Sequence, residues 1–277
     1  MKVVLLNDTS LYSGHFGCQI IGQVYREQFK RVGIELILSL PKYFDEDLFR
    51  TKLEEADLVV VNGEGSIHHG RNMHLIDVAN RYPSVLVNCV YQDNPESEGL
   101  RKMLHISARE SLSAGEIRRR GVGCDVVPDM LFASSMIRSF PLIENSLSQG
   151  IGVTDSVVKE YRRILGVKRR VKADMYAHGQ TPAEYLRKLS GYSRVCAGRF
   201  HSAVACAVIG IPFSAWESNT WKTEGMMNDA GLSHLYASSR EEALLLVPDE
   251  FPEEMHVFRE DAFRKIEINF EKLLGLV

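Results

Sequence analysis

Residues 195–216 constrain the fold of this chain more than any other stretch. An apolar run at 195–197 leads into Gly198, and a helix-like run of small apolar residues follows. Gly210 ends that run, and a second apolar run occupies 213–216. Two short apolar runs on either side of one helix are typical of a βαβ unit, in which the two strands are parallel. The chain is therefore predicted to be an α/β protein.

Arg199 and His201 occupy the first strand-to-helix turn of this unit. In open parallel sheets such turns lie at the carboxyl ends of strands, where ligands bind. Arginine offers a planar fork for a carboxylate or a phosphate, and histidine exchanges a proton near neutral pH. The N-terminus of the following helix also favours anions. We predict that both residues belong to a functional site; the alternative is a surface charge at 199 and a helix cap at 201.

The same alternation of strand-like and helix-like runs fills the rest of the chain. Residues 134–148 show no clear period and are predicted to form a linker. We therefore expect two Rossmann-like halves facing a cleft, residues 1–140 and 141–277, the second ending in a long helix at 254–274. Further strands are expected at 3–6, 34–40, 58–61, 85–91, 150–154, 171–176 and 235–237, and further helices at 19–32, 45–56, 95–104, 112–120, 156–165, 182–189 and 239–247.

A glycine-rich turn follows the apolar run at 58–61. Gly63 and Gly65 would let backbone approach a ligand closely, but a dinucleotide fingerprint is excluded because its third glycine is missing. His68 and His69 come next. Neighbouring residues on one element point in different directions, and no zinc-ligand pattern accompanies this pair, so we predict no metal site. The loop after the first strand and this turn supply the candidate substrate-binding residues Gly14, Gly63, Glu64, Gly65, Ser66 and His68.

Charged residues follow other strands as well. Arg109 lies where a strand near 105 gives way to a helix. It is either a second residue that binds an anion or a surface charge. After 213–216 a polar loop leads into a helix that carries Lys222, either as an anion contact or as a solvated helix start. Asp129, in a Pro-Asp turn, is interpreted as a structural carboxylate. Arg109 joins the candidate catalytic residues, and the candidate substrate contacts of the second turn are Asn219, Thr220, Lys222 and Glu224.

Composition narrows the class of protein. Hydrophobic residues make up 45% of the chain, charged residues make up 25%, and the net charge is −3, which is typical of a soluble globular protein without a basic field for nucleic acid or membranes. The five cysteines have no C-x-x-C spacing and mostly lie in apolar runs, which favours free thiols in a cytoplasmic protein. The first apolar run is too short for a signal peptide, and no run reaches the ~18 residues of a membrane span.

Four stretches, taken in order, resemble the polysaccharide pyruvyl transferase family. They are the apolar strand with its glycine turn at 59–66, the Arg-Glu-Ser helix start at 108–113, the Pro-Asp segment at 127–132, and the Gly-Arg-Phe-His signature at 198–203. The order of all four is more specific than any one of them. Glu64 stands where the family often has a glycine.

The resemblance implies a fold like that of two-domain GT-B glycosyltransferases, with the N-terminal half on the acceptor side and the C-terminal half on the donor side. It also implies transfer of a pyruvyl group from phosphoenolpyruvate to a sugar of a cell-surface polysaccharide or its precursor, forming a ketal. Arg109 and Arg199 would clamp the carboxylate and phosphate of the donor, and His201 would be the acid or base. No cofactor and no metal are expected beyond the donor substrate. A lipid-linked acceptor would bring the enzyme to a membrane surface.

Two other functions fit the same residues. In a GT-B glycosyltransferase that uses a nucleotide-sugar, the arginines would hold a diphosphate, and Lys222 and Glu224 would contact the donor. A non-catalytic protein that binds sugars or nucleotides would use the same scaffold without turnover. We make no prediction of the oligomeric state or of the sugar acceptor.

Overall fold

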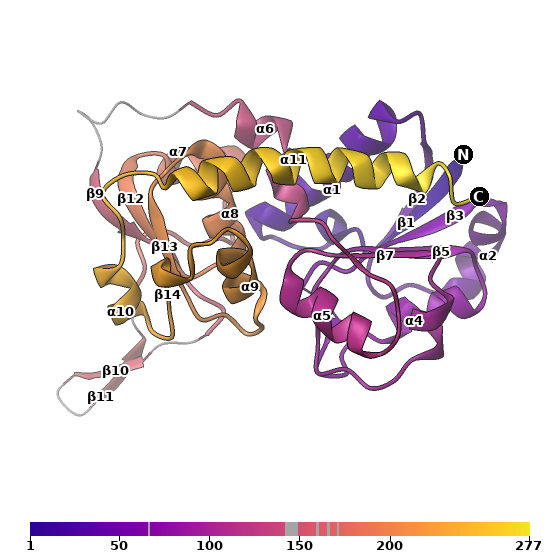
Figure 1. Cartoon of the computed structure of the whole chain (residues 1–277), viewed down its shortest axis with the longest axis horizontal. Helices are drawn as coiled ribbons and strands as arrows, with labels where there is room; N and C mark the ends of the chain where they lie inside the picture. The colour runs from indigo at the N-terminus through magenta and orange to yellow at the C-terminus, as the bar shows by residue number, and fades with distance from the viewer. Residues whose placement is uncertain (66, 142–148, 159–160, 165–166, 171) are drawn as a thin grey trace. The chain divides into compact units, whose positions relative to one another are not determined.

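A computed structural model describes the chain except for residues 66, 142–148, 159–160, 165–166 and 171 (Figure 1). The chain folds into two compact units. Unit 1 comprises residues 1–13, 18–134 and 261–277, and unit 2 comprises residues 14–17 and 135–260. Each unit is described by itself, and the domain limits 1–140 and 141–277 stay a prediction.

Unit 1 is built on a parallel sheet. Its described residues form six strands in the order β2-β1-β3-β5-β7-β8, and every neighbouring pair is parallel. The order reverses direction at β1, so the loops after β1 and β3 flank the point where doubly wound sheets bind ligands. The strands are β1 (Lys2–Leu6), β2 (Glu35–Leu40), β3 (Leu58–Asn62), β5 (Ser84–Cys89), β7 (His105–Ala108) and β8 (Asp125–Val126), and a separate pair joins β4 (Ile67–His68) to β6 (Tyr91–Gln92).

Three of the described helices of unit 1 begin at polar caps. The side chains of Asp45, Ser97 and Glu110 each accept a hydrogen bond from a backbone N–H in the first turn of α2, α4 and α5. These caps are why the helices begin one to three residues away from where their periodicity alone would place them. The helices are α1 (Phe16–Arg31), α2 (Glu46–Glu55), α3 (His74–Asp77), α4 (Glu98–Lys102) and α5 (Ser111–Arg119).

The long C-terminal helix is confirmed as α11 (Glu253–Leu273). Its residues from 261 onward belong to unit 1, where the Phe270 ring lies 5.9 Å from the Tyr25 ring and 5.5 Å from the Phe29 ring of α1. On the surface, Arg31 Nη1 donates to Glu271 Oε1 at 2.8 Å. The end of the chain therefore completes the core of the unit that the start of the chain begins. No helix in the described part of the chain combines the length and the apolar composition needed to cross a bilayer.

Unit 2 contains a second parallel sheet, of four strands among its described residues, in the order β14-β13-β12-β9. The predicted βαβ unit is confirmed as β12 (Tyr192–Ala197), α8 (Phe200–Ile209) and β13 (Phe213–Trp216). Gly210 ends α8 in the left-handed conformation, at φ 95°. The other strands and helices of this unit are β9 (Gln149–Val153), β14 (Tyr236–Ala237), α6 (Ser135–Arg138), α7 (Pro182–Leu189), α9 (Lys222–Asp229) and α10 (Arg240–Leu245).

The predictions of two secondary-structure elements in unit 2 are wrong. Where a helix was expected at 156–165, the chain forms β10 (Tyr161–Ile164), which pairs antiparallel with β11 (Val167–Arg170). Each strand completes the backbone hydrogen bonds of the other, and the periodicity of one segment does not reveal such a partner. The expected strand at 171–176 is reduced, in its described residues, to one bridge between Met175 and Thr154. Residues 142–148 of the predicted linker lie outside the described residues, and part of the remainder forms α6.

The two parallel sheets confirm the α/β class. The other expected strands and helices are present with shifted ends, and a capping box formed by Thr181 and Glu184 opens α7. Two halves that face a cleft stay a prediction.

Candidate functional site

Arg199 lies between β12 and α8, at the carboxyl end of the strand. Its Nε and Nη2 both donate to Asp155 Oδ2, at 3.0 and 2.7 Å. Asp155 follows β9, the neighbouring strand, and its Oδ1 accepts a second hydrogen bond from the backbone N–H of Ala177 at 2.9 Å. Arg199 is therefore held in place by a buried carboxylate. The alternative of a surface charge at 199 is wrong.

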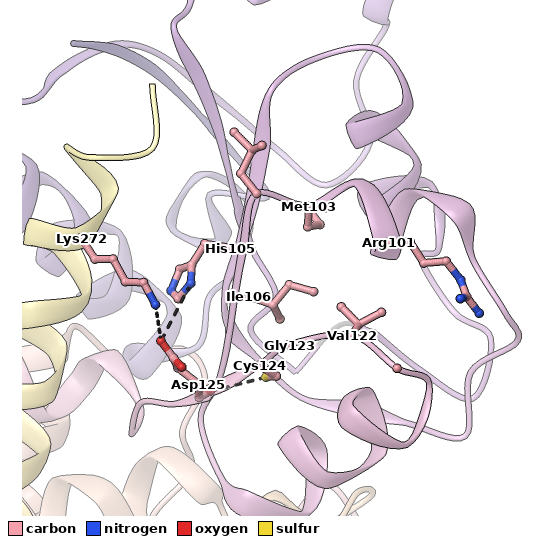
Figure 2. A pocket seen from close by; sticks show the side chains of 11 residues that line it. Arg101, Met103, His105, Ile106, Val122, Gly123, Cys124, Asp125 and Lys272 are labelled. Carbon is pink, nitrogen blue, oxygen red and sulfur yellow. Dashed lines mark hydrogen bonds and ion pairs between the residues drawn. The ribbon is translucent and has the colours of Figure 1, made fainter.

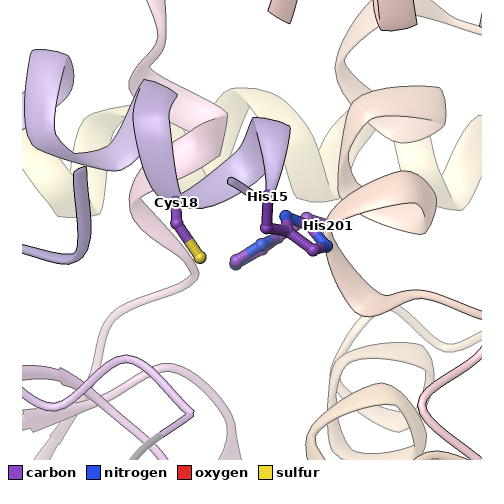
Figure 3. Close-up of side chains that lie close together, drawn as sticks. All are labelled: His15, Cys18 and His201. Carbon is purple, nitrogen blue, oxygen red and sulfur yellow. The ribbon is translucent and has the colours of Figure 1, made fainter. Parts of the chain in front are cut away.

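His201 lies in the first turn of α8 and is buried. The residue that caps this helix is Arg199, so the alternative of a cap at 201 is also wrong. The ring of His201 lies 5.2 Å from the ring of His15, nearly perpendicular to it, and Figure 3 shows the two imidazoles next to each other. The His15 ring in turn lies 5.0 Å from that of His178. Three imidazoles of unit 2 therefore meet beside Arg199.

The segment of residues 14–17 brings His15 into unit 2. The backbone N–H of Phe16 donates to Ala177 O at 3.0 Å, and the Phe16 ring stacks on Tyr185 with the centroids 3.9 Å apart. Gly14 contributes its carbonyl, which accepts a hydrogen bond from Gly179 N at 3.4 Å. The predicted residue Gly14 therefore holds this segment in place, while the side chain that reaches His201 is that of its neighbour, His15.

Positive charges dominate the electrostatics of this site. Burial lowers the pKa of His15 well below its ordinary value, and the charges of His201, Arg199, His178 and Lys222 lower it further. Burial and the charge of Arg199 also lower the pKa of His178. A histidine whose pKa falls in this way stays neutral at pH 7. These five residues, which we name the basic cluster, are suited to hold an anionic ligand: His15, His178, Arg199, His201 and Lys222.

Lys222 is the first residue of α9 and is only 8% exposed, so a solvated helix start is wrong. Its ammonium group donates to Thr220 Oγ1 at 3.1 Å and to Asn219 Oδ1. Asn219 and Thr220 therefore orient the lysine. Glu224 lies two residues later and is half-buried, and its charge acts on the hydroxyl of Tyr236 in β14.

The glycine-rich turn of unit 1 needs its glycines for two different reasons. A Cβ at Gly63 would lie 2.2 Å from Cβ of Cys89, which the packing of β5 forbids. Gly65 has a φ of 52°, and a Cβ there would lie 3.5 Å from Nη2 of Arg109. The turn and Arg109 therefore lie together. Ser66 lies outside the described residues.

Glu64 is a buried carboxyl group between these glycines. Its Oε2 accepts a hydrogen bond from the hydroxyl of Thr9, and its Oε1 accepts one from the thiol of Cys18 at 3.1 Å. Burial raises its pKa, and the charge of Asp129 adds to that effect. Glu64 is therefore biased toward the protonated form, a state in which a carboxyl group can donate a hydrogen bond.

His68 does not join this turn. It lies in β4, buried, and its Nδ1 is 2.9 Å from Nδ1 of His69. His69 Nε2 lies 3.3 Å from Asp93 Oδ2. The pair of histidines therefore interacts with itself and with the loop after β6.

Arg109 is 2% exposed, so the alternative of a surface charge is wrong. Its Nη1 donates to Asp129 Oδ2 at 2.7 Å, and the side chain of Asp129 also accepts from the backbone N–H of Leu131. The structural interpretation of Asp129 is confirmed. Both charges are removed from water, so the stabilisation of each buried charge depends on the other.

We expect Asp129→Asn to lower the free energy of unfolding by about 3–5 kcal/mol, because it leaves the Arg109 charge buried without its counter-ion. Asparagine can still accept from Leu131 N, so the change isolates the charge. Urea unfolding measures the loss. The matched control is Asp47→Asn, which removes an exposed partner of Arg50 and should cost at most about 1 kcal/mol. Equal losses in the two variants would contradict this account of the pair.

A cavity of about 470 Å³ in unit 1 lies beside the amino ends of β7 and β8 (Figure 2). Lys272 Nζ donates to Asp125 Oδ2 at 2.7 Å, and His105 Nδ1 lies 4.0 Å from the same oxygen. His105 Nε2 is 2.8 Å from Asn269 Oδ1 in α11. These contacts attach the C-terminal helix to the sheet, and no predicted site residue lines the cavity.

Three residues of the basic cluster and its surroundings were not predicted. His15 and His178 precede α1 and α7 in polar loops, and Asp155 follows the strand at 149–153. Their common signal is a position just after a strand or just before a helix, which many loop residues share. What selects them is their contact with Arg199 and His201, which lie far away in the sequence.

A family model described as polysaccharide pyruvyl transferase matches residues 15–215. No curated protein matches the chain. Among solved structures, a functionally uncharacterized protein from Klebsiella pneumoniae subsp. pneumoniae is similar in fold, with a TM-score of 0.58 and 12% identity over 86% of this chain and 93% of that chain. At that identity the likeness concerns the fold alone.

Proposed function

Because the chain belongs to the polysaccharide pyruvyl transferase family, we propose that it transfers a pyruvyl group from phosphoenolpyruvate to a sugar of a polysaccharide or its precursor. One observation carries the choice of donor. The basic cluster of unit 2 combines a fixed arginine fork with three imidazoles and a buried lysine. Phosphoenolpyruvate bears a carboxylate and a phosphate on adjacent atoms, and such groups bind to arginine and to clustered cations.

The proposed reaction consumes no cofactor. Two hydroxyls of the acceptor form bonds to carbon 2 of phosphoenolpyruvate, and the bond from that carbon to the phosphate oxygen breaks. One hydroxyl proton goes to the methylene carbon, which becomes a methyl group, and the other leaves with the phosphate. The products are a pyruvyl ketal and inorganic phosphate, so the reaction needs proton transfers and stabilisation of the departing phosphate.

The residues divide these tasks. Arg199, positioned by Asp155, would hold an anionic group of the donor and stabilise the departing phosphate. His201 would carry the proton transfer. Arg109, predicted as a second clamp, already has Asp129 as its counter-ion, which favours a role in shaping the turn at Gly65.

The other parts of the proposal extend the prediction from sequence. The arrangement would be GT-B-like, with the acceptor side in the N-terminal half, where Glu64 and the glycine-rich turn would face the sugar. A cytoplasmic location is supported by five cysteines that are all free. A lipid-linked acceptor would bring the protein to a membrane surface.

We expect phosphoenolpyruvate to raise the melting temperature and UDP-, GDP-, ADP- and CMP-sugars to leave it unchanged. A ligand at 100 times its dissociation constant stabilises the folded state by about 2.7 kcal/mol, which a thermal-shift assay detects. Proton NMR with a panel of hexoses and N-acetylhexosamines would then follow the loss of the donor's methylene signals and the appearance of a ketal methyl signal. Stabilisation by one nucleotide-sugar in place of phosphoenolpyruvate would indicate a glycosyltransferase.

A further inference from the structure

His15 stands directly before α1, a helix of 16 residues, and its ring caps that helix. The backbone N–H of Gly17 donates to His15 Nδ1 at 3.0 Å. A ring nitrogen that accepts a backbone hydrogen bond carries no proton, so a neutral His15 has its proton on Nε2. The tautomer of this side chain is therefore set by the backbone of the helix that follows.

We propose that His15 is a neutral hydrogen-bond donor of the basic cluster, which presents Nε2–H to an anionic group of the bound substrate. The inference rests on the proposed function for the identity of that substrate, phosphoenolpyruvate. It gives His15 a role separate from that of His201. His15 binds charge without exchanging its proton, while the proton transfer is assigned to His201.

The surroundings of His15 hold it in the neutral form. It is 7% exposed, and the bases His201, Arg199, His178 and Lys222 all disfavour its protonated form. Asp155, the nearby carboxylate, has both oxygens occupied by Arg199 and Ala177 N. Protonating Nδ1 would also break the hydrogen bond from Gly17. Both effects lower the pKa of His15, so it stays neutral as the pH falls through the ordinary histidine range.

The position of the ring is fixed as firmly as its tautomer. His15 pairs with His178 in a backbone bridge, and its ring stacks on that of Phe16 at 5.1 Å. A Cβ at Gly17 would lie 2.3 Å from Nδ1 of His201, so only glycine lets the two imidazoles approach as they do. A donor that is already oriented gains more from a charged ligand than one that must be ordered on binding.

Nitrogen-15 NMR of histidine-labelled protein tests the tautomer without any need for activity. We expect His15 to show the Nε2–H pattern and to keep it from pH 8 to pH 5.5. Added inorganic phosphate, and separately phosphoenolpyruvate, should shift the His15 Nε2–H signal. A protonated Nδ1, a titration of His15 near pH 6.5, or a Nε2–H signal that neither anion moves would overturn the proposal.

Two substitutions distinguish a role of His15 in ligand binding from a role in maintaining the structure. In His15→Phe the donor is lost, and we expect the dissociation constant for phosphoenolpyruvate to rise about 10- to 100-fold, the effect of one hydrogen bond to a charged group. In His15→Gln the side-chain amide can still donate, so affinity should recover to within a few fold of the wild type. A merely structural role predicts equal losses of affinity in both variants, in step with their melting temperatures.

The same experiments distinguish the two proposals. If a nucleotide-sugar or inorganic phosphate binds and phosphoenolpyruvate does not, the proposed function fails. The comparison of His15→Phe with His15→Gln is then made with that anion. If phosphoenolpyruvate binds equally well to the wild type and to His15→Phe, the role of His15 fails and the proposed function stands.

Discussion

Replacement of His201 by glutamine is expected to lower kcat for pyruvyl transfer about 10²- to 10⁴-fold, the usual contribution of a positioned acid or base. The affinity for phosphoenolpyruvate should change by no more than a few fold. Glutamine fills a similar space and can still donate a hydrogen bond, but it cannot exchange a proton near neutral pH. The loss should therefore appear in kcat and leave the melting temperature close to that of the wild type. Steady-state kinetics with the acceptor found in the NMR panel, together with a thermal-shift titration of the donor, measures both quantities.

His234→Gln is the matched control, because His234 is an exposed histidine of the same unit. It should leave kcat, affinity and melting temperature unchanged. A His201→Gln variant that loses affinity and kcat in proportion would show that His201 binds the donor and transfers no proton. The wild-type pH profile of kcat gives a second check, since the group that transfers the proton should leave an inflection that the variant lacks.

The fold was predictable where the signal is local. Residues 195–216 contain strand, turn, helix and strand in one continuous stretch, and the structure reproduces them because each element meets its neighbour in the chain. The hairpin of β10 and β11 was missed because the pairing of Tyr161 with Arg170, and not the periodicity of either segment, decides its structure.

The site was predictable only in part, for the same reason. Arg199 and Lys222 were found because they follow strands of a recognisable sheet. His15 was not, because its place in the basic cluster depends on contact with His201, which lies far away in the sequence. Arg109 and Asp129 were both noticed, but a sequence does not show that the two are paired and buried. Burial changes the role of such residues, because a charge that could bind a ligand becomes part of a structural ion pair.

Replacement of Arg199 by alanine is the second change with a large expected effect. The guanidinium group can offer two charge-assisted hydrogen bonds to the donor, each worth about 1.5–3 kcal/mol. We therefore expect the dissociation constant for phosphoenolpyruvate to rise at least about 100-fold. The variant should also be less stable by about 3–5 kcal/mol, because Asp155 stays buried without its counter-ion. Calorimetric titration measures the first effect and urea unfolding the second.

Two further variants separate these effects. Arg199→Lys keeps the charge but not the planar fork, so it should recover stability better than affinity. Arg199→Ala combined with Asp155→Ala removes both charges, so stability should largely return while the affinity for phosphoenolpyruvate stays low. Affinity that returns with stability in the double variant would mean that Arg199 only maintains the fold around Asp155. The anion would then be held by the remaining members of the basic cluster, His15, His178, His201 and Lys222.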